Sequence, residues 1–285
     1  MGITVAVVAQ GTMGAGVGKR LNEHGATVRT LLSGRSEASA NRAKAAGMTP
    51  AADERELLSG ADYFLSILPP DQALALANRL APALQSLSVK PVYVDCNAVS
   101  PQTAERIAAI VEPTGAAFVD GGIIGGPPRE GYGGPAIYAS GPEADRTKAL
   151  ADWGLDWRII DGPIGAASGL KMSYAGITKG TTAIAAAMLL GAARFGCGEA
   201  LIAELSASQP EMLKRMRAGI PGMYDKAYRW VGEMEEISDF LEANAPSSAM
   251  YQGIARLYEF LATAEAEASP ADDNAIKTLD RVLGR

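Results

Sequence analysis

The chain has 285 residues, of which 48% are hydrophobic and 20% are charged, a composition typical of a globular protein with one large or two ordinary domains. Its formal net charge of −6 gives no reason to expect binding to nucleic acid or to an anionic membrane. The two cysteines are too few for a disulfide framework, and no cluster of side chains indicates a metal site.

The first eight residues, Met-Gly-Ile-Thr-Val-Ala-Val-Val, predict a strand and lack the basic segment of a signal peptide. The longest uncharged helical run, Gly180 to Ala193, is shorter than the roughly 20 residues that cross a bilayer. Because a disulfide framework is also missing, we expect a cytoplasmic protein with no membrane partner.

From residue 3 to about 160, short runs of β-branched residues alternate with helical segments, which is typical of βαβ units on a parallel sheet. The expected strands cover residues 3–8, 26–32, 63–68, 92–95, 117–120 and 136–139. The expected helices cover residues 13–24, 37–46, 71–80 and 101–111. We therefore predict a Rossmann domain over residues 1–161, an α/β fold with a doubly wound, mainly parallel sheet.

After residues 157–160 the pattern changes, and no further strand is expected. One long helix, rich in alanine, is predicted from Gly162-Pro163 to about Arg194. The remainder is helical, with breaks at 209–210, 219–222 and 244–247. The prediction is an all-helical domain over residues 162–285, joined to the first domain by the long helix.

A glycine-rich turn follows the first strand, with the sequence Ala9-Gln-Gly11-Thr-Met-Gly14-Ala-Gly16. This is the dinucleotide pattern G-x-G-x-x-G with Ala9 in place of its first glycine, and it lies between a strand and a helix. In such a turn the second glycine lets the backbone approach the pyrophosphate, and the helix N-terminus offers free N–H groups. A glycine turn that binds nothing is the alternative, but the context favours cofactor contacts at Gly11, Thr12, Met13 and Gly14.

The end of the second strand indicates which cofactor binds. An NAD enzyme places Asp or Glu about 20 residues after the fingerprint, where it bonds the ribose 2′-OH. This chain has Ser33-Gly-Arg35-Ser36 there and no carboxylate before Glu37. Two hydroxyls and a guanidinium fork suit a 2′-phosphate, whereas an arginine in a solvated loop would leave NAD open. We predict NADP rather than NAD, bound by Ser33, Arg35 and Ser36.

The stretch Gly162-Pro-Ile-Gly165-Ala-Ala-Ser-Gly-Leu-Lys171 resembles the catalytic signature of the β-hydroxyacid dehydrogenases. Two glycines and the lysine match, while Ala167 stands at the third glycine and Ala175 at the asparagine of that signature. Residues 9–14, 94–101 and 120–126 resemble three further motifs of the family, in the expected order. The chain thus resembles the β-hydroxyacid and 6-phosphogluconate dehydrogenase-like superfamily, in a side branch with a C-terminal helical domain of unknown function.

This resemblance implies an NAD(P)-dependent dehydrogenase or reductase that acts on CH–OH groups and forms a homodimer through the helical domain. It also implies further cofactor contacts at Leu68, Pro69 and Asn97. The implied substrate contacts are Gly122, Ile123, Ile124 and Gly125. Ile124 stands where the family has a serine, which predicts a site less centred on a carboxylate and open to a bulkier alcohol.

Lys171 is the expected general acid/base, because hydride transfer from an alcohol requires a group that takes the hydroxyl proton. A free lysine is mostly protonated at pH 7, and both desolvation and a nearby nicotinamide cation would favour its neutral form. Lys171 shares its helix face with Ala167, Tyr174, Ala175 and Thr178, and we predict that the Tyr174 hydroxyl contacts the substrate. The alternative is a solvated lysine on a long helix.

The leading hypothesis is an NADP-dependent oxidoreductase that transfers hydride between the nicotinamide and a small hydroxy or oxo compound. An imine reductase is a second hypothesis, because related folds reduce C=N bonds. Lys171 favours alcohol chemistry, but the missing asparagine at position 175 weakens that argument. A third reading, without catalysis, is a redox sensor that binds NADP(H). The sequence does not identify the substrate.

Overall fold

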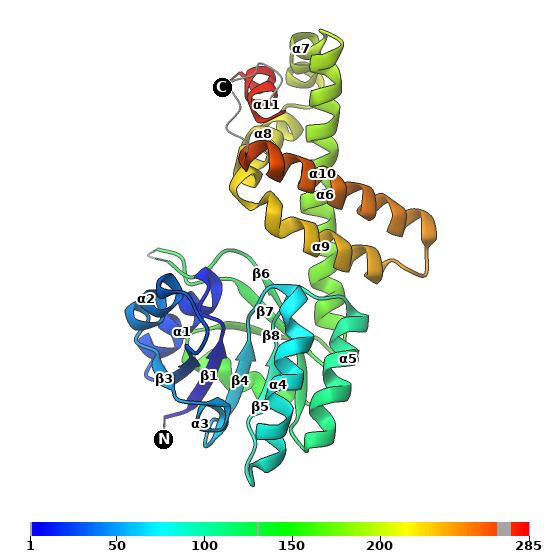
Figure 1. The fold of residues 1–285 in the computed structure, drawn as a ribbon. Coiled ribbons are helices and arrows are strands. Elements are labelled where there is room, and N and C mark those ends of the chain that lie inside the picture. The colour runs from blue at the N-terminus through cyan, green and yellow to red at the C-terminus, as the bar shows by residue number, and fades with distance from the viewer. Residues whose placement is uncertain (1, 130, 267–274, 285) are drawn as a thin grey trace. The chain divides into compact units, whose positions relative to one another are not determined.

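The computed structural model describes residues 2–129, 131–266 and 275–284, and the chain forms two compact units, Met1–Met172 and Ser173–Arg285 (Figure 1). The boundary lies within the long helix α6 (Ala166–Arg194), later than the expected residue 161. About two turns of α6 therefore belong to the first unit.

The first unit contains one eight-stranded sheet with the strand order β3-β2-β1-β4-β5-β6-β7-β8. All neighbouring strands are parallel except β6 and β7, which confirms the predicted Rossmann-like, mainly parallel sheet. The strands are β1 (Thr4–Val8), β2 (Thr27–Leu31), β3 (Thr49–Ala51), β4 (Tyr63–Ser66), β5 (Val92–Asp95), β6 (Phe118–Ile124), β7 (Ala136–Ser140) and β8 (Asp156–Ile159).

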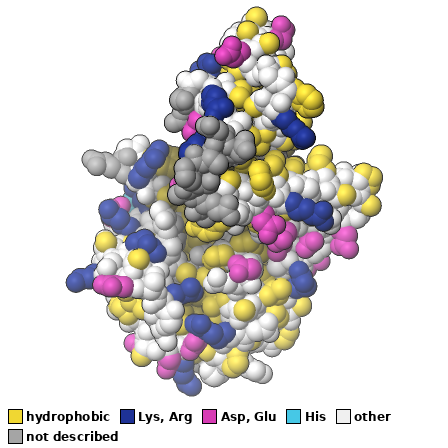
Figure 2. Space-filling view, turned by 45° about the horizontal axis from the view of Figure 1, so that its top comes forward, with side chains coloured by type: hydrophobic (Ala, Val, Ile, Leu, Met, Phe, Trp, Pro, Cys, Tyr) yellow, Lys and Arg dark blue, Asp and Glu magenta, His cyan; other side chains and the backbone are white. Residues whose placement is uncertain are grey.

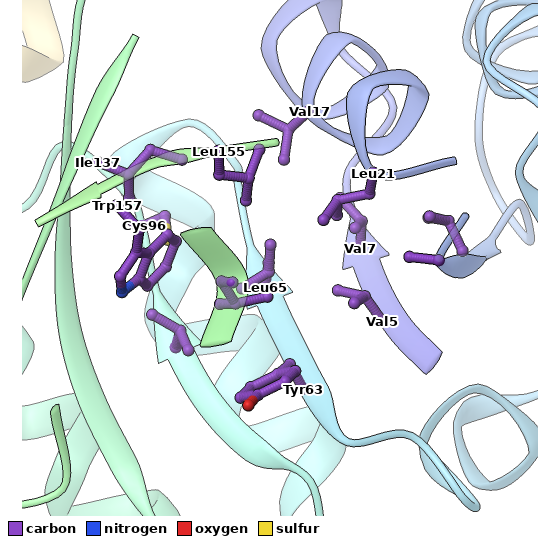
Figure 3. Close-up of a cluster of buried hydrophobic side chains, with 14 of the residues drawn as sticks. Val5, Val7, Val17, Leu21, Tyr63, Leu65, Cys96, Ile137, Leu155 and Trp157 are labelled. Carbon is purple, nitrogen blue, oxygen red and sulfur yellow. The ribbon is translucent and has the colours of Figure 1, made fainter. Parts of the chain in front are cut away.

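Helices cover both faces of this sheet and enclose two hydrophobic cores. The first core lies under α1 (Thr12–Glu23), α2 (Glu37–Ala45) and η3 (Ala144–Trp153). In Figure 3, Val17 and Leu21 of α1 point toward Val7 of β1. The second core lies under α3 (Glu54–Leu58), α4 (Ala73–Ser86) and α5 (Pro101–Val111). Strands buried on both faces explain the continuous apolar runs in the sequence.

Three differences from the sequence-based prediction have physical reasons. Strand β3 and helix α3 were not predicted, because they are only three and five residues long and show no clear hydrophobic period. Helix α4 starts at Ala73 after the short 3₁₀ turn η1 (Pro70–Gln72) and continues through Pro82. Strand β6 continues to Ile124, because its last five residues pair with the antiparallel strand β7.

The described residues of the second unit are helical and contain no strand, as predicted. After α6 come α7 (Gly198–Ser208), α8 (Pro210–Gly219), η4 (Pro221–Lys226), α9 (Ala227–Phe240), α10 (Ala245–Ala266) and α11 (Ala275–Leu283). The short 3₁₀ turn η2 (Glu112–Thr114) follows α5 in the first unit. The partly buried side chain of Lys179 pairs with Glu233 and lies over the Trp230 ring, 5.0 Å from its centroid. This contact ties α6 to α9.

Among the described residues, α6 is the one helix whose length and composition would allow it to cross a membrane. Part of this helix is buried, since Ala183, Ala186 and Leu189 lie inside the second unit, whereas Ile177, Ile184 and Met188 are exposed. The core helix of a globular protein has the same composition.

Candidate functional site

The carboxyl ends of β1, β4 and β5 lie next to one another at one edge of the sheet, level with Asp120 of β6. Val8 pairs with Ser66, Ser66 with Asp95, and Asp95 with Asp120. The segments that follow these residues carry the fingerprint, Leu68-Pro69, Asn97 and the predicted substrate loop. In open α/β sheets, ligands bind outside the carboxyl ends of the strands. The fold therefore brings the predicted site residues of the first unit to one edge.

The fingerprint turn has the geometry that a pyrophosphate needs. A Cβ atom on Gly14 would lie 1.8 Å from the Ala9 carbonyl oxygen, so α1 can pack this closely only through a glycine. At Gly11 a Cβ atom would meet nothing within 4 Å, and the residue is exposed. Gly11 is also the N-cap of α1 and supplies no side-chain cap. The first N–H groups of α1 are left for a ligand or for water, and they attract anions.

Arg35 lies half-buried after β2 and makes no side-chain hydrogen bond or ion pair with any residue that the structure describes. Burial, and then the nearby charge of Arg79, lower the pKa of its guanidinium. Of the two predicted hydroxyl contacts, Ser33 is exposed, whereas the Ser36 oxygen caps α2 by accepting a hydrogen bond from the Ser39 N–H at 3.3 Å. Ser36 thus caps α2, in addition to its predicted contact with the 2′-phosphate.

Two further arginines at this edge were not expected from the sequence. Arg42 of α2 donates from Nε to the Gln10 carbonyl of the fingerprint at 2.8 Å, and Arg79 of α4 pairs with Glu54 at 3.0 Å. Lys and Arg side chains lie on this side of the first unit, where α1 and α2 lie (Figure 2). No local pattern marks either arginine, because each reaches the site from a different helix.

Asn97 is buried and holds two strand ends together. Its side-chain oxygen accepts a hydrogen bond from the backbone N–H of Leu68, and its amide nitrogen donates to the Ser66 hydroxyl at 2.8 Å and to the Asp95 carboxylate. The predicted cofactor contacts at Leu68 and Asn97 are thus bonded to each other. The side chain of Asn97 fixes the course of the chain after β4.

Asp95 is fully buried at the end of β5. Burial and the neighbouring Asp120 raise the pKa of its carboxyl to about 7, against the opposing effect of Ser66 and Asn97. One oxygen, Oδ1, accepts from Asn97, whereas Oδ2 has no hydrogen-bond partner among the described residues.

Asp120 anchors the start of α6 under the sheet. Its carboxylate accepts hydrogen bonds from the backbone N–H groups of Gly165 at 2.9 Å and Ser168 at 3.0 Å. The hydroxyls of Ser168 and Ser140 donate to it as well, at 2.6 and 3.0 Å. Burial raises the pKa of Asp120, and these hydrogen bonds oppose the rise. A carboxylate at a helix N-terminus also interacts favourably with the helix dipole.

This anchor places Lys171 against strand β6. A Cβ atom on Gly122 would lie 2.6 Å from the Ala167 carbonyl oxygen and 3.3 Å from Cβ of Lys171, so only a glycine lets α6 approach this closely. Gly165 has φ +96°, and a Cβ there would lie 2.9 Å from Pro101. Gly122 of β6 and Gly165 of the catalytic pattern therefore set the position of Lys171, which is itself partly buried.

The other predicted substrate residues differ in their surroundings. The side chain of Ile123 is buried in the first hydrophobic core, whereas Ile124 and Gly125 are more exposed at the end of β6. Tyr174 is 50% exposed on α6 and belongs to the second unit. The structure thus brings Lys171 and Gly122 together, and the role of Tyr174 stays a prediction.

Family comparisons agree with this division of the chain. Residues 4–151 match the model described as the NAD binding domain of 6-phosphogluconate dehydrogenase. Residues 192–261 match a domain of unknown function (DUF1932). An uncharacterized 28.5 kDa protein in the 7S RNA 5′ region of Methanothermus fervidus is 29% identical over 215 residues, which cover 75% of this chain and 81% of that protein.

Solved structures with the same fold span the whole chain. A conserved protein of unknown function, described as similar to 3-hydroxyacid dehydrogenases, is 28% identical with a TM-score of 0.69, over 93% of this chain and 100% of its own. The 3-hydroxyisobutyrate dehydrogenase of Mycobacterium tuberculosis is 19% identical (TM-score 0.69, covering 100% and 99%). An imine reductase of Myxococcus stipitatus is 18% identical (TM-score 0.58, covering 99% and 100%).

The N-terminal match covers more than half of the chain and includes every strand up to β7. It confirms the superfamily that the fingerprint indicated, and the second match confirms the helical side branch. The catalytic pattern before Lys171 lies between the two matches. The chain belongs to the family that carries the NAD binding domain of 6-phosphogluconate dehydrogenase, here followed by the helical domain of unknown function.

Proposed function

We propose that this protein is an NADP-dependent oxidoreductase that transfers hydride between the nicotinamide and a small hydroxy or oxo compound, with Lys171 as general acid/base. The observation that supports this most directly is the placement of Lys171. The buried carboxylate of Asp120 holds the start of α6. Gly122 lets Lys171 lie against β6 at the carboxyl edge of the sheet, the edge that also carries the fingerprint.

The residues at this edge fit a dinucleotide. Gly11 leaves open space before the uncapped N-terminus of α1, and Arg35 is a half-buried cation without an anionic partner in the described chain. The nicotinamide, when bound, accepts or donates the hydride. Lys171 would take the hydroxyl proton at Nζ during oxidation and return it during reduction.

We expect Arg35→Ala to weaken NADPH binding about tenfold to a hundredfold and to leave NADH binding nearly unchanged. The reason is that a charge-assisted hydrogen bond is worth about 1.5–3 kcal/mol, and only NADPH carries the 2′-phosphate. Fluorescence titration of wild type and variant with both cofactors, at one fixed salt concentration, measures this. Arg158→Ala is a matched control, because Arg158 is exposed on β8 and paired with Asp156. Equal losses for both cofactors would contradict the NADP assignment, and binding of neither by wild type would remove the proposed function.

An imine reductase remains the second candidate, favoured by Ala175 where the hydroxyacid pattern has asparagine and by Ile124 where it has serine. Both changes remove polar groups that would hold a hydroxyacid. A turnover screen with small alcohols and hydroxyacids in one direction and cyclic imines in the other separates the two. Tight cofactor binding without turnover of either class would favour a redox sensor.

We also propose a cytoplasmic homodimer in which α6 packs against a second copy. Tyr174, Ile177, Ile184 and Met188 are all at least half exposed, and their spacings of three, seven and four residues fit a heptad seam in which Thr181 occupies the position between Ile177 and Ile184. Because such a seam is self-complementary, the expected occupant is the same helix of another copy.

We expect Ile184→Glu to convert this dimer to a monomer in size-exclusion chromatography with light scattering, because it places a charge in the seam. Phe260→Glu changes an equally exposed apolar residue on α10 and is expected to leave the dimer intact. A wild-type monomer at micromolar concentration would contradict the proposal.

A further inference from the structure

Two hydrogen bonds connect the buried carboxylate of Asp95, through the buried amide of Asn97, to the partly buried backbone after β4. Asp95 accepts a hydrogen bond from the side-chain amide of Asn97, and the amide oxygen of Asn97 accepts from the N–H of Leu68. Asn97 is 2% exposed and Asp95 is fully buried, so solvent does not replace the bond between them. The Asp95 carboxylate thus orients the Asn97 amide at its nitrogen, and the amide oxygen in turn holds the backbone of residues 67–69 through the Leu68 N–H.

The position of Asp95 is costly for the fold. Its Oδ2 atom has no hydrogen-bond partner among the described residues, and its strand neighbour in the register is a second carboxylate, Asp120. Burial of an ionised carboxylate is unfavourable unless cations or several donors compensate. A neutral side chain of the same shape could hold Asn97 at lower cost. Groups in such an environment are common at functional sites.

We propose that Asp95 is a positioning residue for the dinucleotide: its ionised carboxylate fixes the Asn97 amide, which holds the segment after β4 in the conformation that binds the cofactor. The proposal rests on nicotinamide dinucleotide binding by this domain and is independent of the reaction that follows.

The physical basis is the strength of the Asp95–Asn97 bond in the two states of the carboxyl. A hydrogen bond to an ionised acceptor is roughly twice as strong as one to a neutral acceptor. With its pKa raised to about 7, Asp95 changes state close to neutral pH. The cofactor should therefore bind more tightly as the pH rises through 7 and lose affinity as the pH falls, since protonation weakens the bond that orders Asn97.

The titratable groups around Asp95 are Tyr93 on its own strand, Cys96 directly after that strand and Asp120 on β6. Burial raises the pKa of both the Tyr93 hydroxyl and the Cys96 thiol, so both stay neutral at pH 6–8. After burial itself, Asp120 is therefore the neighbouring group whose charge raises the pKa of Asp95 most. No cationic side chain contributes to this environment among the residues described.

The test is the dissociation constant of NADPH and of NADH between pH 6 and pH 8.5, measured by fluorescence for wild type and Asp95→Asn. NADH is included because it lacks the 2′-phosphate, which itself titrates near pH 6. Relative to the variant, wild type should gain about fivefold in affinity across this range, with a midpoint near 7. Asp95→Asn should keep the weaker, low-pH affinity throughout. The variant should also melt at a higher temperature than wild type at pH 8, because a costly buried charge has been removed.

Two further variants separate positioning from a general structural effect. Asp120→Asn removes the neighbouring charge, so the midpoint of the affinity profile should move to lower pH while its amplitude is retained. Cys96→Ala changes an adjacent buried side chain outside the hydrogen-bond chain, and its profile should remain that of wild type. Should Asp95→Asn fail to fold, the shift in Asp120→Asn alone still decides the question.

The proposal is overturned if Asp95→Asn binds either cofactor as tightly as wild type at pH 8, or if it retains the wild-type pH profile. An unmoved midpoint in Asp120→Asn would overturn it as well. Failure of wild type to bind either cofactor at any pH is a different result, since it removes the proposed function itself.

Discussion

Lys171→Ala should lower turnover by about 10²–10⁴-fold while the dissociation constant of NADPH stays within about twofold of wild type. The magnitude is that of general acid/base catalysis, and the expected split follows from the position of the lysine. Lys171 extends from α6 beside Gly122 of β6, whereas the fingerprint lies after β1. A lost proton-transfer group affects the chemical step and leaves cofactor binding in place.

The matched control is Lys148→Ala, because Lys148 is an exposed lysine whose partner, Asp145, lies in the same turn. Added small primary amines should restore part of the turnover of Lys171→Ala, since an amine of suitable size can occupy the vacated space and carry the proton. Unchanged turnover in Lys171→Ala would remove this residue from the mechanism. Loss of cofactor binding together with turnover would assign it a structural role.

Gly14→Ala should destabilise the first unit by about 3 kcal/mol or more and abolish dinucleotide binding. Gly11→Ala, in contrast, should leave the melting temperature unchanged and still weaken dinucleotide binding. At Gly14 the added Cβ would lie 1.8 Å from the backbone oxygen of Ala9, so the turn or α1 must move. Overpacking of this kind commonly costs about 1–3 kcal/mol, and a clash with backbone lies at the upper end.

At Gly11 the added methyl group meets nothing within 4 Å, and its φ of −65° suits any residue. Its effect would then arise only when the pyrophosphate approaches the backbone. Thermal unfolding and cofactor titration of the two variants, side by side, measure both effects. Wild-type affinity in Gly11→Ala would show that the pyrophosphate does not approach this turn. Wild-type stability in Gly14→Ala would contradict the close packing of α1.

The sequence alone was sufficient to predict the fold class and the region of the site. Alternation of β-branched runs with helices is a local signal, and strand β5 and helix α5 have the predicted bounds. The fingerprint and the glycines before Lys171 could also be found, because each depends on backbone geometry that only glycine allows at a fixed spacing. Strand β3 and helix α3 were missed because they are shorter than a hydrophobic period.

Only the tertiary structure decided which side chains cooperate. The carboxylate of Asp120 accepts hydrogen bonds from the N–H groups of Gly165 and Ser168, far along the chain, which no local pattern indicates. Arg79 reaches the surroundings of Arg35 from another helix, and the burial that raises the pKa of Asp95 comes from the strands on either side. Sequence patterns record periodicity and spacing within one element, whereas hydrogen bonds, desolvation and charge coupling depend on distances between elements, which arise only when the sheet and its helices pack.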